Sequence, residues 1–343
     1  MSATTGKRGI GINGLGRIGK LVLQISEGRE GCPVQVVAIN DPFMSCGDIV
    51  YAIKYDSVHG RFAGTVVEGD DGESVVINGR RVAVGSSKEP AACNWAAHGA
   101  SIVVDCSGQF TSLAGASEHL KGGAERVVVS APSKDIPMFV LGVNGDELTA
   151  DDHVVSNASC TTNCLAPLVK VVHDAFGIEE AVATTVHAAT GSQRIVDLNN
   201  KKNHRLGRSG MLNIIPSTTG AAAAVAKVFP ALDGRITGMA MRVPTADVSV
   251  VDVTIKLASP ASLDDIHAAM TAAAAGDMAG ILGVTADAVV STDFVGSTYS
   301  CVYDADASLA LSDTFVKLIG WYDNEYSYTA RLVDLIERVV ALA

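Results

Sequence analysis

Cys160 combines a reactive side chain with a position that favours chemistry. A short strand is predicted to end with His-Val-Val at residues 153–155, just before Ser-Asn-Ala-Ser-Cys-Thr-Thr-Asn-Cys at residues 156–164. Apolar residues then recur at helical spacing, at Leu165, Leu168, Val169 and Val172, which predicts a helix beginning near Cys160. The N–H groups and partial positive charge of a helix N-terminus favour thiolate over thiol. Cys160 is therefore a candidate nucleophile, although most cysteines are small buried hydrophobic residues.

A nucleophilic thiol needs a base, and His187 is the best placed of the eight histidines. It ends the apolar run 182–186 and precedes the polar residues 190–192, so it stands where a strand opens into a loop. By contrast, His98, His119 and His173 have the pattern of ordinary surface positions. A histidine at a strand end is more often structural, so its role as base is a prediction that depends on Cys160.

A glycine-rich segment near the N-terminus has the context of a dinucleotide site. Gly-Leu-Gly-Arg-Ile-Gly at residues 14–19 follows a predicted strand, Gly9 to Asn13, and opens a predicted helix. Glycines allow the backbone to approach a pyrophosphate, whose charge would lie on the helix N-terminus at Arg17 and Ile18. Asp41 ends the next strand, where a carboxylate binds ribose hydroxyls and repels a 2′-phosphate. NAD is the predicted cofactor, rather than NADP.

Together, a nucleotide site and a nucleophilic thiol narrow the reaction class. A thiolate can attack an aldehyde to give a thiohemiacetal, which a nicotinamide can oxidise to a thioester. A ketone or hydroxy acid offers no such chemistry. The sequence therefore predicts an NAD-dependent aldehyde oxidation through Cys160.

The first half of the chain has the strand pattern of a doubly wound parallel sheet. Several short strands are continuous apolar runs, which is typical of parallel strands covered on both faces. A hairpin with a type I′ turn at Asn78-Gly79 is predicted between residues 74–77 and 80–84. The predicted strands are Gly9 to Asn13, Val34 to Asn40, Ser101 to Cys106, Arg126 to Ser130, Met138 to Val143 and His153 to Ser156.

The second half has longer strands with a different pattern. Within residues 248–257, apolar positions alternate with polar ones, which indicates an antiparallel sheet with one wet face. Other strands are predicted at residues 181–186, 235–243 and 314–322, and helices near residues 219–228, 262–275 and 326–341. The fold class is therefore α/β: a Rossmann domain at 1–158, an α+β catalytic domain with a mostly antiparallel sheet at 159–324, and a C-terminal helix at about 325–343 that packs back on the first domain.

Residues 191–212 form a polar stretch with little periodicity and several basic residues, among them Arg194, Lys201, Lys202, Arg205 and Arg208. A loop of this length inside a globular protein is usually functional or part of an interface. A simple solvated charge run is the equally weighted alternative.

Composition excludes several classes of protein. The 343 residues are 48% hydrophobic and include 34 glycines, enough for two folded domains. A net charge of −11 argues against nucleic acid as the primary partner. The seven scattered cysteines, together with no apolar signal stretch and no run long enough to span a bilayer, predict free thiols and a cytoplasmic setting. No cluster with zinc-ligand spacing is present in the sequence, so no metal is expected.

Seven segments match a known family in order and spacing. The chain resembles phosphorylating glyceraldehyde-3-phosphate dehydrogenase over essentially its whole length, and the segment around Cys160 is highly specific to that family. The resemblance implies a glycolytic homotetramer in the cytoplasm that uses NAD and inorganic phosphate. The segments are residues 10–19, 38–42, 156–167, 185–188, 213–222, 237–245 and 321–325.

The resemblance also implies roles for individual residues. Cys160 is the nucleophile and His187 its base. The substrate's own phosphate is bound by Thr190, Ser192 and Arg242, and inorganic phosphate by Ser159, Thr161, Thr219 and Gly220. Residues 191–212 line the cofactor pocket of a neighbouring subunit. The implied cofactor contacts are Asn13, Gly14, Gly16, Arg17, Ile18, Asp41, Lys88, Ser130, Asn324, which fixes the nicotinamide carboxamide, and Tyr328 near the ring.

Some positions depart from the family pattern. Asn199 replaces a proline typical of NAD-specific members, so discrimination against NADP depends mainly on Asp41. Ser192 replaces a threonine but keeps the hydroxyl. Two rival functions are an erythrose-4-phosphate dehydrogenase, which hydrolyses its thioester, and a regulatory protein that binds nucleotides or RNA. The complete set of phosphate-site residues favours phosphorolysis, and the acidic charge disfavours RNA.

Overall fold

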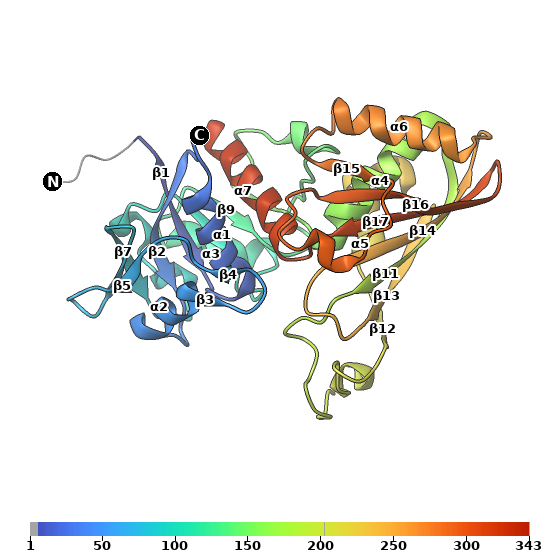
Figure 1. The fold of residues 1–343 in the computed structure, drawn as a ribbon. Coiled ribbons are helices and arrows are strands. Elements are labelled where there is room, and N and C mark those ends of the chain that lie inside the picture. Colours follow the sequence, from blue (N-terminus) through green and yellow to red (C-terminus); the bar gives the residue numbers. More distant parts are fainter. Residues whose placement is uncertain (1–5, 202, 343) are drawn as a thin grey trace. The chain divides into compact units, whose positions relative to one another are not determined.

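Two groups of residues, each with its own core, make up the computed structural model, which describes residues 6–201 and 203–342 (Figure 1). Unit 1 contains the residues up to Phe139, Glu147–Ala158 and the residues from Thr329 onward. Unit 2 contains Val140–Asp146 and Ser159–Tyr328. Lys202 of the predicted basic loop lies outside the described residues. None of the helices in the described ranges has the length and apolar character needed to cross a membrane.

The sheet of unit 1 confirms the doubly wound arrangement. Its strands from β10 to β7 run parallel, and every residue of β8 and β9 is buried, as expected for strands covered on both faces. Helices α1 (Arg17–Gly28), α2 (Cys46–Lys54) and α3 (Leu113–Lys121) pack on this unit (Figure 1). The strand order is β10 (Val154–Ser156), β9 (Arg126–Val129), β8 (Ile102–Asp105), β1 (Arg8–Asn13), β2 (Val34–Asn40), β7 (Arg80–Gly85), β6 (Ser74–Ile77) and β5 (Val66–Glu68).

The predicted hairpin joins β6 and β7, which pair antiparallel. Asn78 has φ of 49° and Gly79 has φ of 77°, the two left-handed residues that a type I′ turn requires. The chain order in the sheet reverses between β1 and β8, because β2 and β7 extend from one side of β1 and β8, β9 and β10 from the other. Ligands of doubly wound sheets bind at such a reversal, beyond the C-terminal ends of the strands.

The strand expected at Met138 to Val143 is wrong. Met138 makes only an isolated bridge to Ser156, and the chain then turns. The reason is turn chemistry: Gly142 adopts φ of 83°, and the side chain of Asn144 accepts a hydrogen bond from the Val140 N–H at 2.8 Å. Met138, Phe139, Val140 and Leu141 are buried without forming a strand.

The seven-stranded sheet of unit 2 is mixed but mostly antiparallel, which confirms the predicted class. Only the β11–β13 and β15–β16 pairs are parallel. The strand order is β12 (Ile215–Thr218), β13 (Ile236–Arg242), β11 (Ile178–His187), β14 (Ser249–Leu257), β17 (Phe315–Tyr322), β16 (Cys301–Ser312) and β15 (Leu282–Thr285). The helices of this unit are α4 (Cys160–Phe176), α5 (Ala221–Val228) and α6 (Leu263–Ala275).

The alternation predicted for β14 is present: Val251, Val253 and Ile255 are fully buried, whereas Lys256 is exposed. The long strand β16 was not predicted. It carries Asp304 and Asp306, and its pairing with β17 shifts register between Asp304 and Leu309, so its sequence lacks a clean period of two.

The C-terminal helix α7 (Tyr326–Ala341) begins in unit 2 and continues, from Thr329, in unit 1. Its residues Asp334 and Glu337 both pair with Arg29, at 2.5 and 3.0 Å, at the end of α1. These partly exposed pairs attach the helix to unit 1 alongside its buried apolar face.

Candidate active site

Cys160 is the first residue of α4, as the sequence predicts. Ser159 caps this helix, because its Oγ accepts a hydrogen bond from the Thr162 N–H at 3.0 Å. The cap fixes the point at which the helix begins and leaves the thiol on its first turn. The backbone N–H groups beside Cys160 lack partners within the helix and are suited to an oxyanion.

His187 ends β11 and faces the thiol. Its Nε2 lies 3.5 Å from Cys160 Sγ, and the residue is 3% exposed. Arg242 ends β13, and the parallel register of β11 and β13 places it directly beside His187. The Arg242 Nη1 is 2.7 Å from His187 Nδ1 and 3.3 Å from the Ala188 carbonyl oxygen. Three predicted residues from three separate elements are thus brought together.

Two groups compete for His187 Nδ1. The Ala188 carbonyl oxygen, at 2.8 Å, accepts a proton from Nδ1, whereas the Arg242 guanidinium can only donate to it. When Nδ1 carries the proton, Nε2 has a free lone pair facing Cys160 and can act as a base. When Arg242 donates to Nδ1, the proton of the neutral ring is on Nε2, which then acts as a donor.

The predicted low pKa of Cys160 is wrong for this arrangement. Burial raises the pKa of the Cys160 thiol, and the positive charge of Arg242 and hydrogen bonds at Thr161 oppose this only in part. Burial, with Arg242 second, lowers the pKa of His187 to about 4. Desolvation outweighs the helix terminus here, so at neutral pH the pair is a thiol beside a neutral imidazole. Such an imidazole can take the thiol proton when sulfur attacks a carbonyl.

Tyr322 joins the elements that carry the nucleophile and the base, a role that was not predicted for it although it lies in the family-like segment 321–325. Its hydroxyl is 2.9 Å from Thr161 Oγ1 on α4 and 2.8 Å from Thr185 Oγ1 on β11. Its ring meets the His187 ring edge-on at 5.9 Å. Because Tyr322 is buried, these hydrogen bonds are costly to lose, and they hold the start of α4 against the end of β11.

The predicted phosphate-binding residues fall into two places. Thr190 and Ser192 lie in one exposed turn, with their hydroxyls 3.0 Å apart. Thr219 lines a very small cavity together with Thr161, and its Oγ1 accepts a hydrogen bond from the Ala221 N–H at 3.1 Å. Gly220 caps α5 with open space around its Cα, so that its backbone is accessible.

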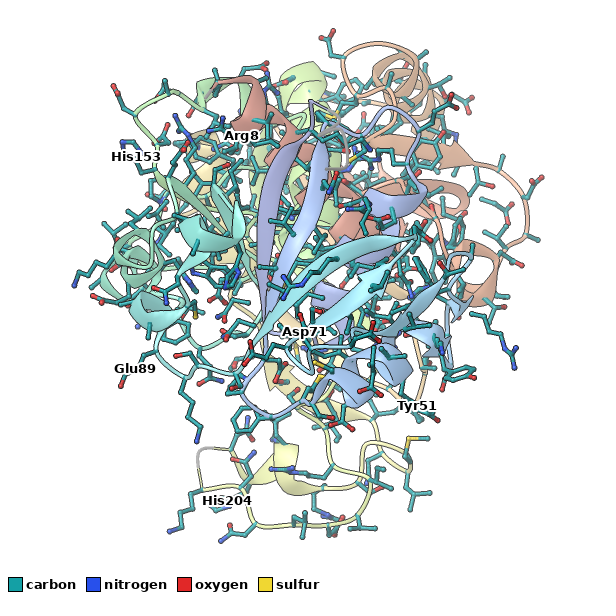
Figure 2. All side chains as sticks on the ribbon, turned by 90° about the vertical axis from the view of Figure 1, so that its left-hand side faces the viewer. Arg8, Tyr51, Asp71, Glu89, His153 and His204 are labelled. Atoms are coloured by element: carbon teal, nitrogen blue, oxygen red, sulfur yellow. The ribbon has the colours of Figure 1, made fainter. Side chains whose placement is uncertain are left out.

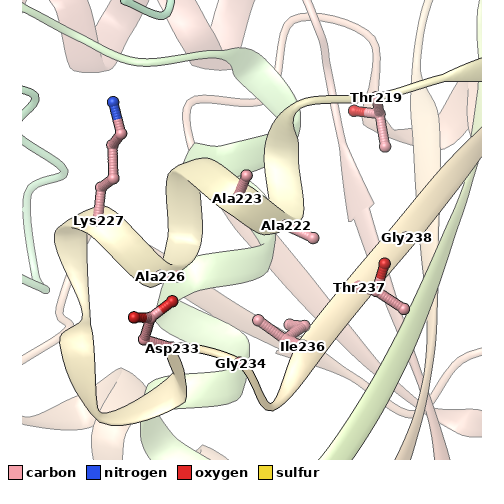
Figure 3. A pocket seen from close by; sticks show the side chains of 10 residues that line it. All are labelled: Thr219, Ala222, Ala223, Ala226, Lys227, Asp233, Gly234, Ile236, Thr237 and Gly238. Atoms are coloured by element: carbon pink, nitrogen blue, oxygen red, sulfur yellow. The ribbon is translucent and has the colours of Figure 1, made fainter. Parts of the chain in front are cut away.

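A second pocket of about 440 Å³ opens between α5 and β13 (Figure 3). Thr219 precedes α5 and Lys227 lies near its C-terminal end, and Asp233 and Thr237 line the pocket below them in this view (Figure 3). Only Thr219 among the predicted site residues lines this pocket.

A crevice of about 660 Å³ lies in unit 1 at the C-terminal ends of β1, β2 and β8. Five of the predicted cofactor residues line it: Asn13, Gly14, Gly16, Asp41 and Lys88. Other lining residues, not predicted, include Phe43, Ser107 and Phe110. The position coincides with the reversal of strand order.

The geometry of this crevice fits a dinucleotide. Gly14 has φ of 89°, and a Cβ there would lie 2.9 Å from the backbone of Ser107, so only glycine fits. Gly16 caps α1 without a side chain and has open space beside it, which leaves the N–H groups of Arg17 and Ile18 accessible to an anion. Oδ2 of Asp41 accepts a hydrogen bond from the Leu15 N–H at 3.0 Å and Oδ1 one from the Phe43 N–H at 3.0 Å, so the carboxylate is fixed at the edge of the crevice.

The other predicted cofactor residues contact different partners. The side chain of Arg17 pairs with Asp56, and Arg17 is not among the residues that line the crevice. Ser130 donates its N–H to the Asp105 carbonyl and does not line the crevice. In unit 2, Asn324 and Tyr328 are 5% and 4% exposed, and Asn324 Oδ1 accepts a hydrogen bond from Ser249 at 2.6 Å.

His119 is not a surface residue, contrary to the sequence-based expectation. It is fully buried on α3, and its Nδ1 accepts the indole N–H of Trp95 at 3.1 Å. This contact places the ring proton on Nε2, which donates to Asp105 at 2.9 Å. The same carboxylate oxygen accepts from Asn13 at 2.9 Å, so the histidine supports the floor of the crevice. His119 can be buried because Trp95 and Asp105 satisfy both of its ring nitrogens, which its sequence neighbourhood does not reveal.

Comparisons with known proteins agree with this arrangement. Residues 8–113 match the profile of the glyceraldehyde 3-phosphate dehydrogenase NAD binding domain, and residues 159–324 match that of the C-terminal domain of the same enzyme. The chain is 55% identical to glyceraldehyde-3-phosphate dehydrogenase 2 of Schizosaccharomyces pombe, over 95% of this chain and 96% of the relative.

Two further relatives differ in the compartment that their names give. A cytosolic glyceraldehyde-3-phosphate dehydrogenase of Gracilaria gracilis is 54% identical, over 97% of this chain and 98% of the relative. A chloroplastic one of Arabidopsis thaliana is 52% identical, over 100% of this chain and 80% of the relative. The chain therefore belongs to the glyceraldehyde 3-phosphate dehydrogenase family and uses NAD as its cofactor.

Proposed function

We propose that the protein oxidises glyceraldehyde 3-phosphate, with NAD and inorganic phosphate, to 1,3-bisphosphoglycerate, reversibly and as a step of glycolysis. The observation that carries the proposal is the 3.5 Å approach of Cys160 Sγ and His187 Nε2 beside Arg242. This arrangement supplies a nucleophile, a base and a cation for a phosphorylated aldehyde.

In the proposed mechanism, Cys160 Sγ attacks the aldehyde carbon while His187 Nε2 takes the thiol proton. The protonated imidazole then donates to the oxyanion of the thiohemiacetal, and the backbone N–H of Cys160 helps; one such donor is typically worth about 3 to 4 kcal/mol. When bound, NAD would supply the acceptor for the hydride that leaves this carbon. The product held on Cys160 is a thioester, and His187 returns its proton to the medium.

The substrate's phosphate is assigned to Thr190, Ser192 and Arg242. A guanidinium can pair with two phosphate oxygens, and the two hydroxyls already lie within 3.0 Å of each other. Drawing Arg242 onto the phosphate would leave the Ala188 carbonyl as the partner of His187 Nδ1. Substrate binding would thereby select the tautomer in which Nε2 can accept the thiol proton.

Inorganic phosphate is assigned to Ser159, Thr161, Thr219 and Gly220. Support comes from the common small cavity of Thr161 and Thr219 and from the open backbone at Gly220, the start of α5. The Ser159 hydroxyl is paired with Thr162 Oγ1 and the Thr161 hydroxyl with the Tyr322 hydroxyl. Each would therefore have to contact phosphate while it keeps, or after it exchanges, this partner. Attack of phosphate on the thioester carbon releases the Cys160 thiolate and the acyl phosphate.

In unit 1, the cofactor is assigned to Asn13, Gly14, Gly16, the backbone of Arg17 and Ile18, Asp41, Lys88 and Ser130. In unit 2, Asn324 and Tyr328 are assigned to the nicotinamide end. The proposal for the adenosine end rests on the crevice of about 660 Å³ and its fixed carboxylate.

The test of this function is NADH formation with and without inorganic phosphate. With glyceraldehyde 3-phosphate as substrate, we expect phosphate to accelerate steady-state turnover at least about tenfold, because phosphate sites are present for attack on the thioester. The control replaces the substrate with erythrose 4-phosphate. A rate that phosphate leaves unchanged, or a preference for erythrose 4-phosphate, would replace the proposal with the hydrolytic rival.

A separate prediction concerns Asp41. We expect Asp41→Ala to raise the ratio of kcat/KM for NADP to that for NAD about ten- to a hundredfold, because the variant no longer places like charge beside a 2′-phosphate. The variant also loses the hydrogen bond to the Leu15 N–H, so the NAD value itself should fall. The ratio is therefore the quantity to measure, with Asn199→Pro as the comparison. A wild type that uses both cofactors equally would show that Asp41 does not act on the ribose.

We also propose that the protein is a cytoplasmic homotetramer. The loop between β11 and β12 extends away from the unit 2 sheet (Figure 1), and side chains around His204 point outward (Figure 2). Ile195, Leu212 and Ile214 are 79%, 84% and 69% exposed, which suggests a surface that another subunit covers. Light scattering should give about four times the 35.4 kDa chain mass. A monomeric mass at micromolar concentration would contradict the proposal.

A further inference from the structure

Ser249 lies between the catalytic base and the residue assigned to the nicotinamide. It is the first residue of β14, it is 1% exposed, and the β14–β17 register places it opposite Tyr322, two residues before Asn324. Its Oγ is 2.6 Å from Asn324 Oδ1 and 3.0 Å from the backbone nitrogen of Ala188. Ala188 directly follows His187 in the chain.

Ser249 accepts one of these hydrogen bonds and donates the other. A backbone N–H only donates, so Ala188 occupies a lone pair of Ser249 Oγ. The hydroxyl of Ser249 donates to Asn324 Oδ1 at 2.6 Å, so the NH₂ group is the other end of the Asn324 side chain. Because amide oxygen and nitrogen have similar shapes, such a bond decides which of them the side chain presents.

We propose that Ser249 is a positioning residue that orients Asn324, so that the amide NH₂ donates to the carboxamide carbonyl of NAD. The inference rests on the proposed role of Asn324 in cofactor binding. Without the Ser249 hydroxyl, the Asn324 amide can rotate and present its oxygen to another oxygen, which is repulsive. The same hydroxyl holds the backbone beside His187, so that one group orders both the base and the cofactor ligand.

A purely structural role is the competing explanation, since a buried hydroxyl that satisfies a backbone N–H contributes to stability wherever it occurs. Ser308 provides a matched control. It is 6% exposed on β16 of the same sheet, donates to the Asp304 carbonyl at 2.6 Å and accepts from the Ile319 N–H at 3.1 Å. Ser308 therefore has the same hydrogen-bond pattern but has no link to a predicted site residue.

The experiment compares the dissociation constants of NAD and of ADP-ribose, which lacks the nicotinamide, by calorimetry on the intact protein. We expect Ser249→Ala to weaken NAD binding about 3- to 10-fold and to leave ADP-ribose binding unchanged, because only the carboxamide loses its donor. Ser249→Thr, which keeps the hydroxyl, should restore the wild-type ratio. Ser308→Ala should lower Tm without changing the ratio. The double variant Ser249→Ala, Asn324→Ala should bind NAD no more weakly than Asn324→Ala alone.

The outcomes distinguish failure of the positioning role of Ser249 from failure of the role of Asn324 in NAD binding. If Asn324→Ala lowers NAD affinity selectively and Ser249→Ala does not, the positioning role is wrong while the role of Asn324 stands. If Asn324→Ala leaves the NAD to ADP-ribose ratio unchanged, both are wrong. Should Ser249→Ala fail to fold, Asn324→Asp tests the orientation directly. It keeps an oxygen for Ser249 but presents a second oxygen in place of NH₂, so normal NAD binding by Asn324→Asp would overturn the assignment.

Discussion

Replacing Cys160 with serine is expected to reduce NADH formation at least about 1,000-fold while NAD affinity and Tm stay close to wild type. A serine hydroxyl is far less acidic than a thiol and cannot form a thioester, so the loss falls on the chemical step. A neutral imidazole with a pKa of about 4 is also too weak a base to activate a serine at 3.5 Å without an orienting carboxylate.

The measurement is steady-state NADH formation, with NAD binding and thermal unfolding as checks on the fold. Cys164→Ser is the control, because Cys164 lies one turn further along α4, is fully buried and hydrogen-bonds to the Gly320 carbonyl. That variant should lose stability but keep turnover within about threefold. If Cys160→Ser keeps a tenth of wild-type activity, the thioester mechanism is wrong.

The second large effect is expected at His187. We expect His187→Asn to lower kcat about 100- to 10,000-fold, the usual range for loss of a general base. Alkylation of Cys160 by iodoacetamide at pH 7 should, by contrast, change less than about threefold. The reason is the sign of the pKa shifts: burial raises the pKa of Cys160, and His187, with a pKa of about 4, carries no charge at pH 7 that could stabilise a thiolate.

His173→Asn is the matched control for this variant. His173 lies near the end of α4, and its Nδ1 accepts the Ile178 N–H at 3.2 Å, away from the thiol. Its turnover should stay within about threefold of wild type. A parallel loss of turnover and of alkylation in His187→Asn would mean that the resting pair is a thiolate and an imidazolium, and that burial does not dominate.

The sequence was sufficient for features that depend on local pattern. The start of a helix at Cys160, the turn at Asn78-Gly79 and the alternation of β14 each follow from a few neighbouring residues. The glycine-rich turn could also be predicted, because a strand precedes it and a helix follows it, and Asp41 could be predicted because it follows the next strand.

Features that depend on partners distant in the chain could not be predicted. The pKa of Cys160 depends on how deeply its sulfur is desolvated, and no local pattern reports this. Tyr322 contacts Thr161 and Thr185 across more than a hundred residues, so its hydrogen bonds could not be predicted from its sequence neighbours. His119 was misassigned for the same reason, since its partners Trp95 and Asp105 become neighbours only in the folded sheet.

The parallel register of β11 and β13 means that the number of residues in each strand constrains the site as much as the identity of the side chains does. His187 and Arg242 are neighbours because they are paired positions on adjacent strands, which lie about 4.8 Å apart. Deleting one residue from β13 would turn the guanidinium to the opposite face of the sheet, and no choice of rotamer could return it. A deletion of two would keep the face but move the charge about 6.6 Å along the strand. Insertions and deletions should therefore be excluded from both strands in functional variants of this chain, even where single substitutions are tolerated.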